Sequence, residues 1–239
     1  MIKNIIFDLG NVVLKLKWNI VIDRYTKDAE TKKLLTEVIF ESEEWKLLDL
    51  GTIEKDYALG VMLSKLPVYL HEACKGIMNE WRDALIINDK MISFLKKIRE
   101  NGYKTYILSN APHEIPPFLE NNDLTQYFDG QIISAEEKVS KPDQGIYNLL
   151  LDRYDLNPEE SVFLDDKLEN IEAAKEANIK IEEPIILEKS YRFKNKELIP
   201  IKTDTGYLYY LEQETEIVRR CPKCNRTDLH IKAYYKSKM

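Results

Sequence analysis

The chain has 239 residues, of which 44% are hydrophobic and 32% are charged, and these ordinary proportions exclude a disordered or fibrous protein. Its 35 basic and 41 acidic residues give a net charge of −6, so no basic field attracts a polyanion and we expect no nucleic-acid partner. The sequence has no apolar run long enough to span a membrane and no small-residue cleavage signature near Met1. We therefore expect a cytoplasmic protein without a membrane partner.

The first predicted element is a buried parallel strand. In KNIIFDLGNVV an apolar run ends in Asp-Leu-Gly-Asn, which is typical of a strand followed by a functional loop. From residue 15 to residue 88 the apolar residues take the spacing of amphipathic helices. We predict that residues 15–88 form an all-helical insertion in a domain that begins with residues 1–14.

Residues 89–190 alternate between helical and extended patterns. Helix DKMISFLKKIREN is closed by Gly102, and strand KTYILSN, helix PPFLENN, strand GQIISAEE, helix QGIYNLLLDRY, strand SVFLDD, helix LENIEAAKEAN and strand KIEEPIIL follow. Together with residues 1–14 they predict a Rossmann-like, doubly wound α/β core. In residues 191–239, GYLYYLEQETEIVRR and DLHIKAYY predict a small β-rich C-terminal appendage.

Acidic and polar side chains follow the predicted strands. Asp8, Ser109 and the pair Asp165-Asp166 should converge, because ligands of open α/β sheets bind outside the carboxyl ends of the strands. Burying a carboxylate at the end of a strand costs free energy unless the carboxylate is paired with a cation or bound to a metal. Several carboxylates in this arrangement provide the oxygen ligands that Mg²⁺ prefers. The Ser109 amide and Lys141 could hold a phosphate, and charge neutralisation is what phosphoryl transfer needs most.

Four motifs, in their order and spacing, resemble those of the haloacid-dehalogenase-like superfamily. They are FDLGNV, ILSN, SKPD and VFLDD, and the likeness covers roughly residues 1–190. The helical insertion is similar to the C1 cap of this family. The DLGNV form, EEWKLLDLGTIEKDYA and DDKLENIEAA are similar to the branch that contains bacterial α-D-glucose-1-phosphate phosphatase and the N-terminal domain of epoxide hydrolase.

The resemblance implies a magnesium-dependent phosphohydrolase that cleaves a small phosphorylated metabolite, such as a sugar phosphate. Asp8 would attack phosphorus and become transiently phosphorylated. Ser109, Asn110 and Lys141 would hold the phosphoryl group.

The resemblance also implies the ligands of Mg²⁺. They would be the carboxylates of Asp8, Asp165 and Asp166 and the backbone carbonyl of Gly10, a role that any residue type can fill.

Gly10 is a departure from the family pattern. Most family phosphatases carry a second aspartate there, which protonates the leaving group and later activates water, and such help is typically worth about 10²–10⁴-fold. Its absence implies either a slower phosphatase or a substrate that needs less help, and we expect the second, because the branch that this chain resembles shares the glycine. The alternative is a catalytically weakened protein that binds a metabolite or a protein partner. A metal-independent dehalogenase is less expected, because that branch lacks the paired acidic motif.

Several residues also have ordinary structural explanations. Asp8 could be a turn or capping residue, Asp165-Asp166 could cap the next helix, and Lys141 could be an exposed loop lysine. We favour the catalytic interpretation because all four motifs occur together. His113, just beyond the ILSN motif, is an outside candidate for substrate contact.

Further residues have less specific expectations. Asn11 and Asn170 are expected to support the site, and Trp18, Trp45 and Trp81 are interpreted as core packing of the insertion.

The appendage contains a CPKC knuckle. Cys221 and Cys224 have the spacing of a Zn²⁺ site, but the usual second pair of ligands is missing. His230 or a second subunit could complete it, and a pair of reduced thiols is the favoured reading. The sequence does not determine the oligomeric state.

Overall fold

The computed structural model describes residues 2–181, and Met1 and residues 182–239 lie outside the described part of the chain. The predicted appendage, with the zinc site expected at Cys221 and Cys224, falls outside it, as does most of the last predicted core strand. No described helix combines the length and the apolar character needed to cross a bilayer.

A five-stranded parallel sheet forms the centre of the core, in the order β5-β4-β1-β6-β7. Its strands are β1 (Asn4–Phe7), β4 (Lys104–Ser109), β5 (Gly130–Ile133), β6 (Ser161–Leu164) and β7 (Lys180–Ile181). All of β1 is buried, and Phe7 is in register with Ile107 of β4 and with Leu164 of β6. The carboxyl ends of these three strands therefore lie close together, and the predicted α/β fold class is confirmed.

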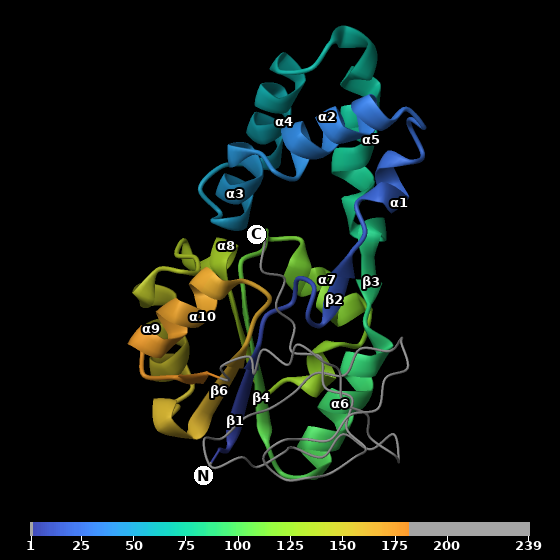
Figure 1. Ribbon diagram of the computed structural model, residues 1–239. Helices are drawn as coiled ribbons and strands as arrows, with labels where there is room; N and C mark the ends of the chain where they lie inside the picture. The colour runs from blue at the N-terminus through green and yellow to red at the C-terminus, as the bar shows by residue number, and fades with distance from the viewer. Residues whose placement is uncertain (1, 182–239) are drawn as a thin grey trace, which may run out of the picture.

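Helices cover both faces of this sheet (Figure 1). They are α6 (Asp89–Glu100), α7 (Ile115–Asn121), α9 (Gln144–Arg153) and α10 (Leu168–Glu176). Because side chains alternate along a strand, Ile5 and Phe7 of β1 pack in one hydrophobic cluster with Phe94 of α6. Ile6 packs in a second cluster with Tyr147 of α9. The alternation buries β1 on both faces, which makes it a rigid support for the residue that follows it.

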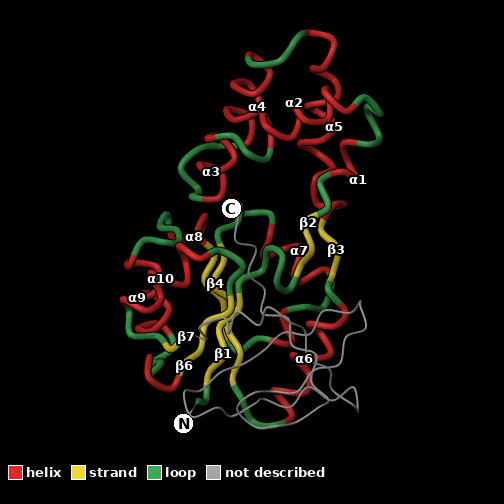
Figure 2. The backbone as a smooth tube through the Cα atoms, in the orientation of Figure 1, coloured by secondary structure: helices red, strands yellow, loops and turns green. Residues whose placement is uncertain are grey.

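A group of helices stands beyond the carboxyl edge of the sheet (Figures 1 and 2). Its members are α1 (Asn19–Ile22), α2 (Ala29–Ile39), α3 (Glu43–Asp49), α4 (Lys55–Ser64), η1 (Val68–Leu70), α5 (His71–Glu80) and η2 (Trp81–Ala84). An antiparallel ribbon of β2 (Leu14–Leu16) and β3 (Leu85–Ile87) joins it to the core. The ribbon was not predicted, because three residues are too few to show an alternating pattern.

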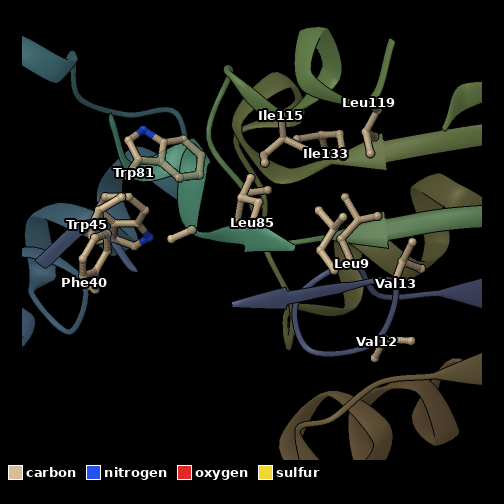
Figure 3. Packing of buried hydrophobic residues seen from close by; sticks show 14 of the residues in the cluster. Leu9, Val12, Val13, Phe40, Trp45, Trp81, Leu85, Ile115, Leu119 and Ile133 are labelled. Atoms are coloured by element: carbon tan, nitrogen blue, oxygen red, sulfur yellow. The ribbon is translucent and has the colours of Figure 1, made fainter. Parts of the chain in front are cut away.

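Aromatic side chains pack where the helical group meets the ribbon. The rings of Trp18 and Phe40 stack with centroids 4.0 Å apart, and Trp45 meets Trp81 edge to face at 5.3 Å. In Figure 3, Phe40, Trp45 and Trp81 lie together, beside Leu85 at the start of β3. Trp45 and Trp81 are buried, so their interpretation as core residues is confirmed.

The predicted strand GQIISAEE is shorter than expected. β5 ends at Ile133, and SAEE forms the short helix α8 (Ser134–Glu137) instead. The Ser134 hydroxyl accepts a hydrogen bond from the Ala111 N–H at 2.9 Å, so the chain leaves the sheet here and packs on the loop after β4. One turn of helix is too short to produce a helical pattern in the sequence, which explains the error.

Candidate active site

Asp8 lies directly after the central strand. Its backbone N–H donates to the Leu164 carbonyl at 2.9 Å, which extends the pairing of β1 with β6, and the residue is only 7% exposed. Its Oδ1 accepts hydrogen bonds from Ser109 Oγ at 3.0 Å and from Lys141 Nζ at 2.8 Å. These contacts come from the end of β4 and from the loop that precedes α9. Asp8 caps no described helix, so the capping explanation does not hold.

Lys141 is a buried cation and not an exposed loop lysine, since the residue is 4% exposed. Its Nζ donates to the Leu108 carbonyl at 2.8 Å, to Asp8 Oδ1 at 2.8 Å and to Asp165 Oδ2 at 2.6 Å. Burial by itself lowers the pKa of Lys141, but Asp165 and Asp8 raise it above its ordinary value. The ammonium therefore keeps its proton between two carboxylates.

Asn110 positions the backbone of Lys141. Its Nδ2 donates to the Lys141 carbonyl at 2.7 Å, and the Lys141 N–H donates to its Oδ1 at 2.8 Å. Both ends of this side-chain amide are therefore engaged by protein. A direct contact of Asn110 with phosphate stays a prediction, and its backbone N–H is the group available for it.

Asparagine side chains hold the acidic pair, as expected of Asn11 and Asn170. Asp165 accepts from Asn170 Nδ2 at 2.9 and 3.0 Å and from the Lys167 N–H at 2.8 Å. Asp166 Oδ2 accepts from Asn11 Nδ2 at 3.0 Å. The N-cap of α10 is Lys167, which makes no side-chain capping bond. The acidic pair therefore turns toward the cluster and does not cap the helix.

Asp8, Asp165 and Asp166 form a cluster of hard oxygen donors. One carboxylate oxygen from each lies within 4.8 Å of the other two. Burial raises the pKa of Asp8 to about 6; Lys141 opposes this shift, and Asp165 and Asp166 add to it. Burial also raises the pKa of Asp166. Three crowded carboxylates with one ammonium fit a divalent cation such as Mg²⁺, which would relieve their repulsion. The Gly10 carbonyl stays a predicted ligand.

Gly10 leaves room for a side chain that it does not carry. A Cβ there would lie 3.4 Å from Leu16 Cδ1 and 3.6 Å from Asp8 Oδ2, both ordinary contacts, and the backbone is outside the left-handed region. Glycine is therefore not required by the backbone at this position. The absence of an acidic side chain at position 10 is therefore not imposed by the backbone conformation or by lack of space.

Two further side chains concern the supply of a proton. His113 is exposed, and no hydrogen bond or ion pair among the described residues joins it to the cluster. Asp49, the last residue of α3, interacts electrostatically with Asp8, although sequence reasoning gave it no role. In the sequence, only its position just before the Gly51 turn could have pointed to Asp49 as a site residue. Its nearness to Asp8 depends on how α3 docks on the core.

Comparison with known proteins agrees with the fold. Residues 2–178 match the profile of the haloacid dehalogenase-like hydrolases. The chain therefore belongs to this family of enzymes, as its four motifs predicted.

The relatives include phosphatases of small molecules. The chain is 31% identical over 176 residues to sesquiterpene phosphatase astK of Aspergillus oryzae, covering 72% of this chain and 84% of that protein. It is 26% identical over 200 residues to D-ribitol-5-phosphate phosphatase of Bacteroides thetaiotaomicron, covering 77% and 92%.

Solved structures share the fold. A family enzyme from Bacteroides thetaiotaomicron, crystallised with magnesium and inorganic phosphate, superposes with a TM-score of 0.61 at 24% identity, covering 79% of this chain and 97% of that one. The L-2-haloacid dehalogenase of Xanthobacter autotrophicus has a TM-score of 0.57 at 17% identity, covering 76% of each chain.

Proposed function

We propose that this phosphatase hydrolyses a small phosphomonoester with Mg²⁺, through an aspartyl-phosphate on Asp8. Its membership of the hydrolase family and its phosphatase relatives support the reaction class. The observation that carries the proposal is the position of Asp8, whose carboxylate lies between the Ser109 hydroxyl, the Lys141 ammonium and two further carboxylates. A buried nucleophile beside a cation and a candidate metal site suits phosphoryl transfer through a covalent intermediate.

Each residue of the cluster has a separate role in the first step, the formation of the aspartyl-phosphate. An oxygen of Asp8 attacks phosphorus, and the bond from phosphorus to the leaving oxygen breaks. Lys141 and the Ser109 hydroxyl, both bonded to Asp8 Oδ1, would bind the phosphoryl oxygens and neutralise their charge. Mg²⁺ held by Asp8, Asp165 and Asp166 would add positive charge beside the same oxygens. In the second step water attacks phosphorus, which releases inorganic phosphate and restores Asp8.

The substrate is proposed to be a phosphorylated metabolite small enough to fit beneath the helical group. The relatives include one named for a sesquiterpene and one for D-ribitol 5-phosphate, so isoprenoid and polyol phosphates join sugar phosphates as candidates. We propose that residues 15–88 act as a cap that selects the substrate, and that residues 1–14 and 89–190 form the catalytic core. The helical group supports this division because it stands beyond the carboxyl edge of the sheet (Figure 1), where Asp8 follows β1.

The test is a phosphatase screen of the purified chain. Aryl, sugar, polyol and isoprenoid phosphates would be compared with Mg²⁺ and with EDTA. We expect phosphate release that EDTA removes and that Mg²⁺ restores. Asp8→Asn should abolish it without loss of fold, whereas Asp152→Asn, on the exposed part of α9, should leave it unchanged. Binding of a phosphorylated compound without turnover by the unaltered chain would favour the weakened binding protein instead.

A further inference from the structure

The carboxyl end of α3 is fixed against the loops of the active site. The backbone carbonyl of Asp49 accepts a hydrogen bond from the Ser134 hydroxyl, which in turn accepts from the Ala111 N–H at 2.9 Å. Ala111 belongs to the loop that follows Ser109, the last residue of β4. The helical group is therefore tied, through one hydroxyl, to the loop that holds part of the catalytic cluster.

Gly51 allows this close approach. Its φ is +70°, in the left-handed region that favours glycine. A Cβ at Gly51 would collide with the backbone carbonyl of Ala135 in α8. The turn after α3 therefore packs against the core backbone to backbone, and this contact sets where Asp49 lies.

The Asp49 carboxyl lies within the electrostatic reach of three core loops. It interacts with Asp8 after β1, with Glu114 at the N-cap of α7, and with Lys167 after β6. It makes no hydrogen bond or ion pair with another side chain in residues 2–181, and it is partly buried. The bonds from the Asp49 carbonyl through Ser134 to Ala111 fix the end of α3 two residues from Ser109, and a carboxyl there without a protein partner is available to a substrate.

The surroundings of Asp49 favour its protonated form. Burial raises its pKa well above the ordinary value; Lys167 opposes the shift, while Asp8 and Glu114 add to it. The acid that the family resemblance leads us to expect two residues after the nucleophile is absent, because Gly10 stands there. A neutral carboxylic acid at Asp49 would supply the proton that Gly10 cannot.

We propose that Asp49 is the general acid and base of the reaction, which it performs from the helical group and not from the core. This inference rests on the function proposed above. As the bond between phosphorus and the leaving oxygen breaks, the Asp49 proton passes to that oxygen and an alcohol leaves. The Asp49 carboxylate then takes a proton from the water that attacks the aspartyl-phosphate, so inorganic phosphate leaves and both Asp8 and protonated Asp49 are restored.

The test compares leaving groups in single-turnover formation of the phosphoenzyme. With a primary alkyl phosphate, Asp49→Asn should slow this step by about 10²–10⁴-fold, because the alkoxide must leave without a proton. With 4-nitrophenyl phosphate, whose leaving group is already a weak base, the rate should change by no more than a few-fold. Asp56→Asn, another carboxylate of the helical group, is exposed and should change neither rate.

A second variant restores an acid at the usual place. In the Asp49→Asn background, Gly10→Asp should recover alkyl phosphate cleavage, whereas Gly10→Asn should not, because the amide has nearly the same shape as the carboxyl group but no acidic proton to donate. The wild-type rate with alkyl phosphate should also fall at high pH as Asp49 loses its proton, under the influence of Asp8, Glu114 and Lys167, and this fall should be absent from Asp49→Asn.

The outcomes separate this inference from the proposed function. Equal losses with both substrates, or no loss with the alkyl phosphate, would overturn the role of Asp49 while leaving the phosphatase intact. If the wild-type chain forms no phosphoenzyme even with 4-nitrophenyl phosphate, the proposed function itself fails.

Discussion

In the described part of the site, the Lys141 ammonium is the one cation that contacts both Asp8 and Asp165. Its side chain is 1% exposed and Asp165's is fully buried, so water screens neither charge. Removing one partner of a buried ion pair leaves an uncompensated charge, which costs far more than the pair contributes. The ammonium group of Lys141, which would bind phosphate, therefore also stabilises the folded state of the metal-free protein.

Replacing Lys141 tests this double role. Lys141→Met should lower the free energy of unfolding of the metal-free protein by about 3–5 kcal/mol, because two buried carboxylates lose their counter-ion. It should also abolish phosphatase activity. Urea unfolding measures the first effect, with Lys104→Met at an exposed position as the control. A loss below about 1 kcal/mol, in the range of a surface ion pair, would contradict the account.

Asp49 predicts a pH dependence of stability. Its folded pKa is raised above the ordinary value of 3.8, so the unfolded chain gives up this proton first. The protein therefore loses stability as pH rises from about 4 through the raised pKa. Asp49→Asn cannot lose a proton, so its unfolding free energy should gain on that of wild type as pH rises. Metal-free urea titrations at several pH values measure this, and a constant difference would contradict it.

At the scale of elements, the docking of α3 onto α8 joins the helical group to the core. Ser134 and Gly51 make this contact; Ser134 lies outside the four motifs, and Gly51 lies in the segment EEWKLLDLGTIEKDYA, whose spacing does not reveal the contact. Because the proposed proton donor ends α3, proton transfer depends on this contact. Displacement of α3 should therefore reduce turnover even when the cluster around Asp8 is intact.

Gly51→Ala tests the docking of α3. The new methyl would meet the Ala135 backbone, so we expect a loss of stability together with a large fall in kcat/KM for alkyl phosphates. Gly102→Ala is the matched control, because Gly102 also has a positive φ of 84° but no atom within 4 Å of a Cβ. Gly102→Ala should lower the free energy of unfolding only by the backbone strain of an alanine at positive φ, about 1–2 kcal/mol. Equal effects of the two changes on kcat/KM would mean that the docking of α3 does not matter for turnover.

The sequence predicted the strands that form continuous apolar runs ending in polar residues. β1 and β4 are buried apolar runs, and their carboxyl ends brought Asp8 and Ser109 together as expected. The pattern failed for short pieces such as β2, β3 and α8, where tertiary contacts determine the conformation. Asp49 could not be predicted for the same reason, since its nearness to Asp8 arises from packing between segments that are separate in sequence.

At the scale of the whole molecule, metal binding should be linked to folding. A cation that binds only the folded cluster stabilises it by about 2.7 kcal/mol when its concentration is one hundred times Kd. Mg²⁺ should therefore raise the Tm of the wild-type chain. Asp166→Asn removes one negative charge from the cluster without breaking the Lys141 ion pairs, so it should remove most of this rise. Asp152→Asn is the control, and a Tm that is insensitive to Mg²⁺ in all three proteins would contradict the proposed metal site.

The covalent step is the central claim, and trapping the phosphoenzyme tests it most directly. The chain would be mixed with 4-nitrophenyl phosphate and Mg²⁺, quenched in acid within one turnover, digested and examined by mass spectrometry. The account predicts one phosphoryl group on the peptide that contains Asp8, and none in Asp8→Asn. Phosphate release without any phosphorylated peptide, or a phosphoryl group on a different residue, would contradict it.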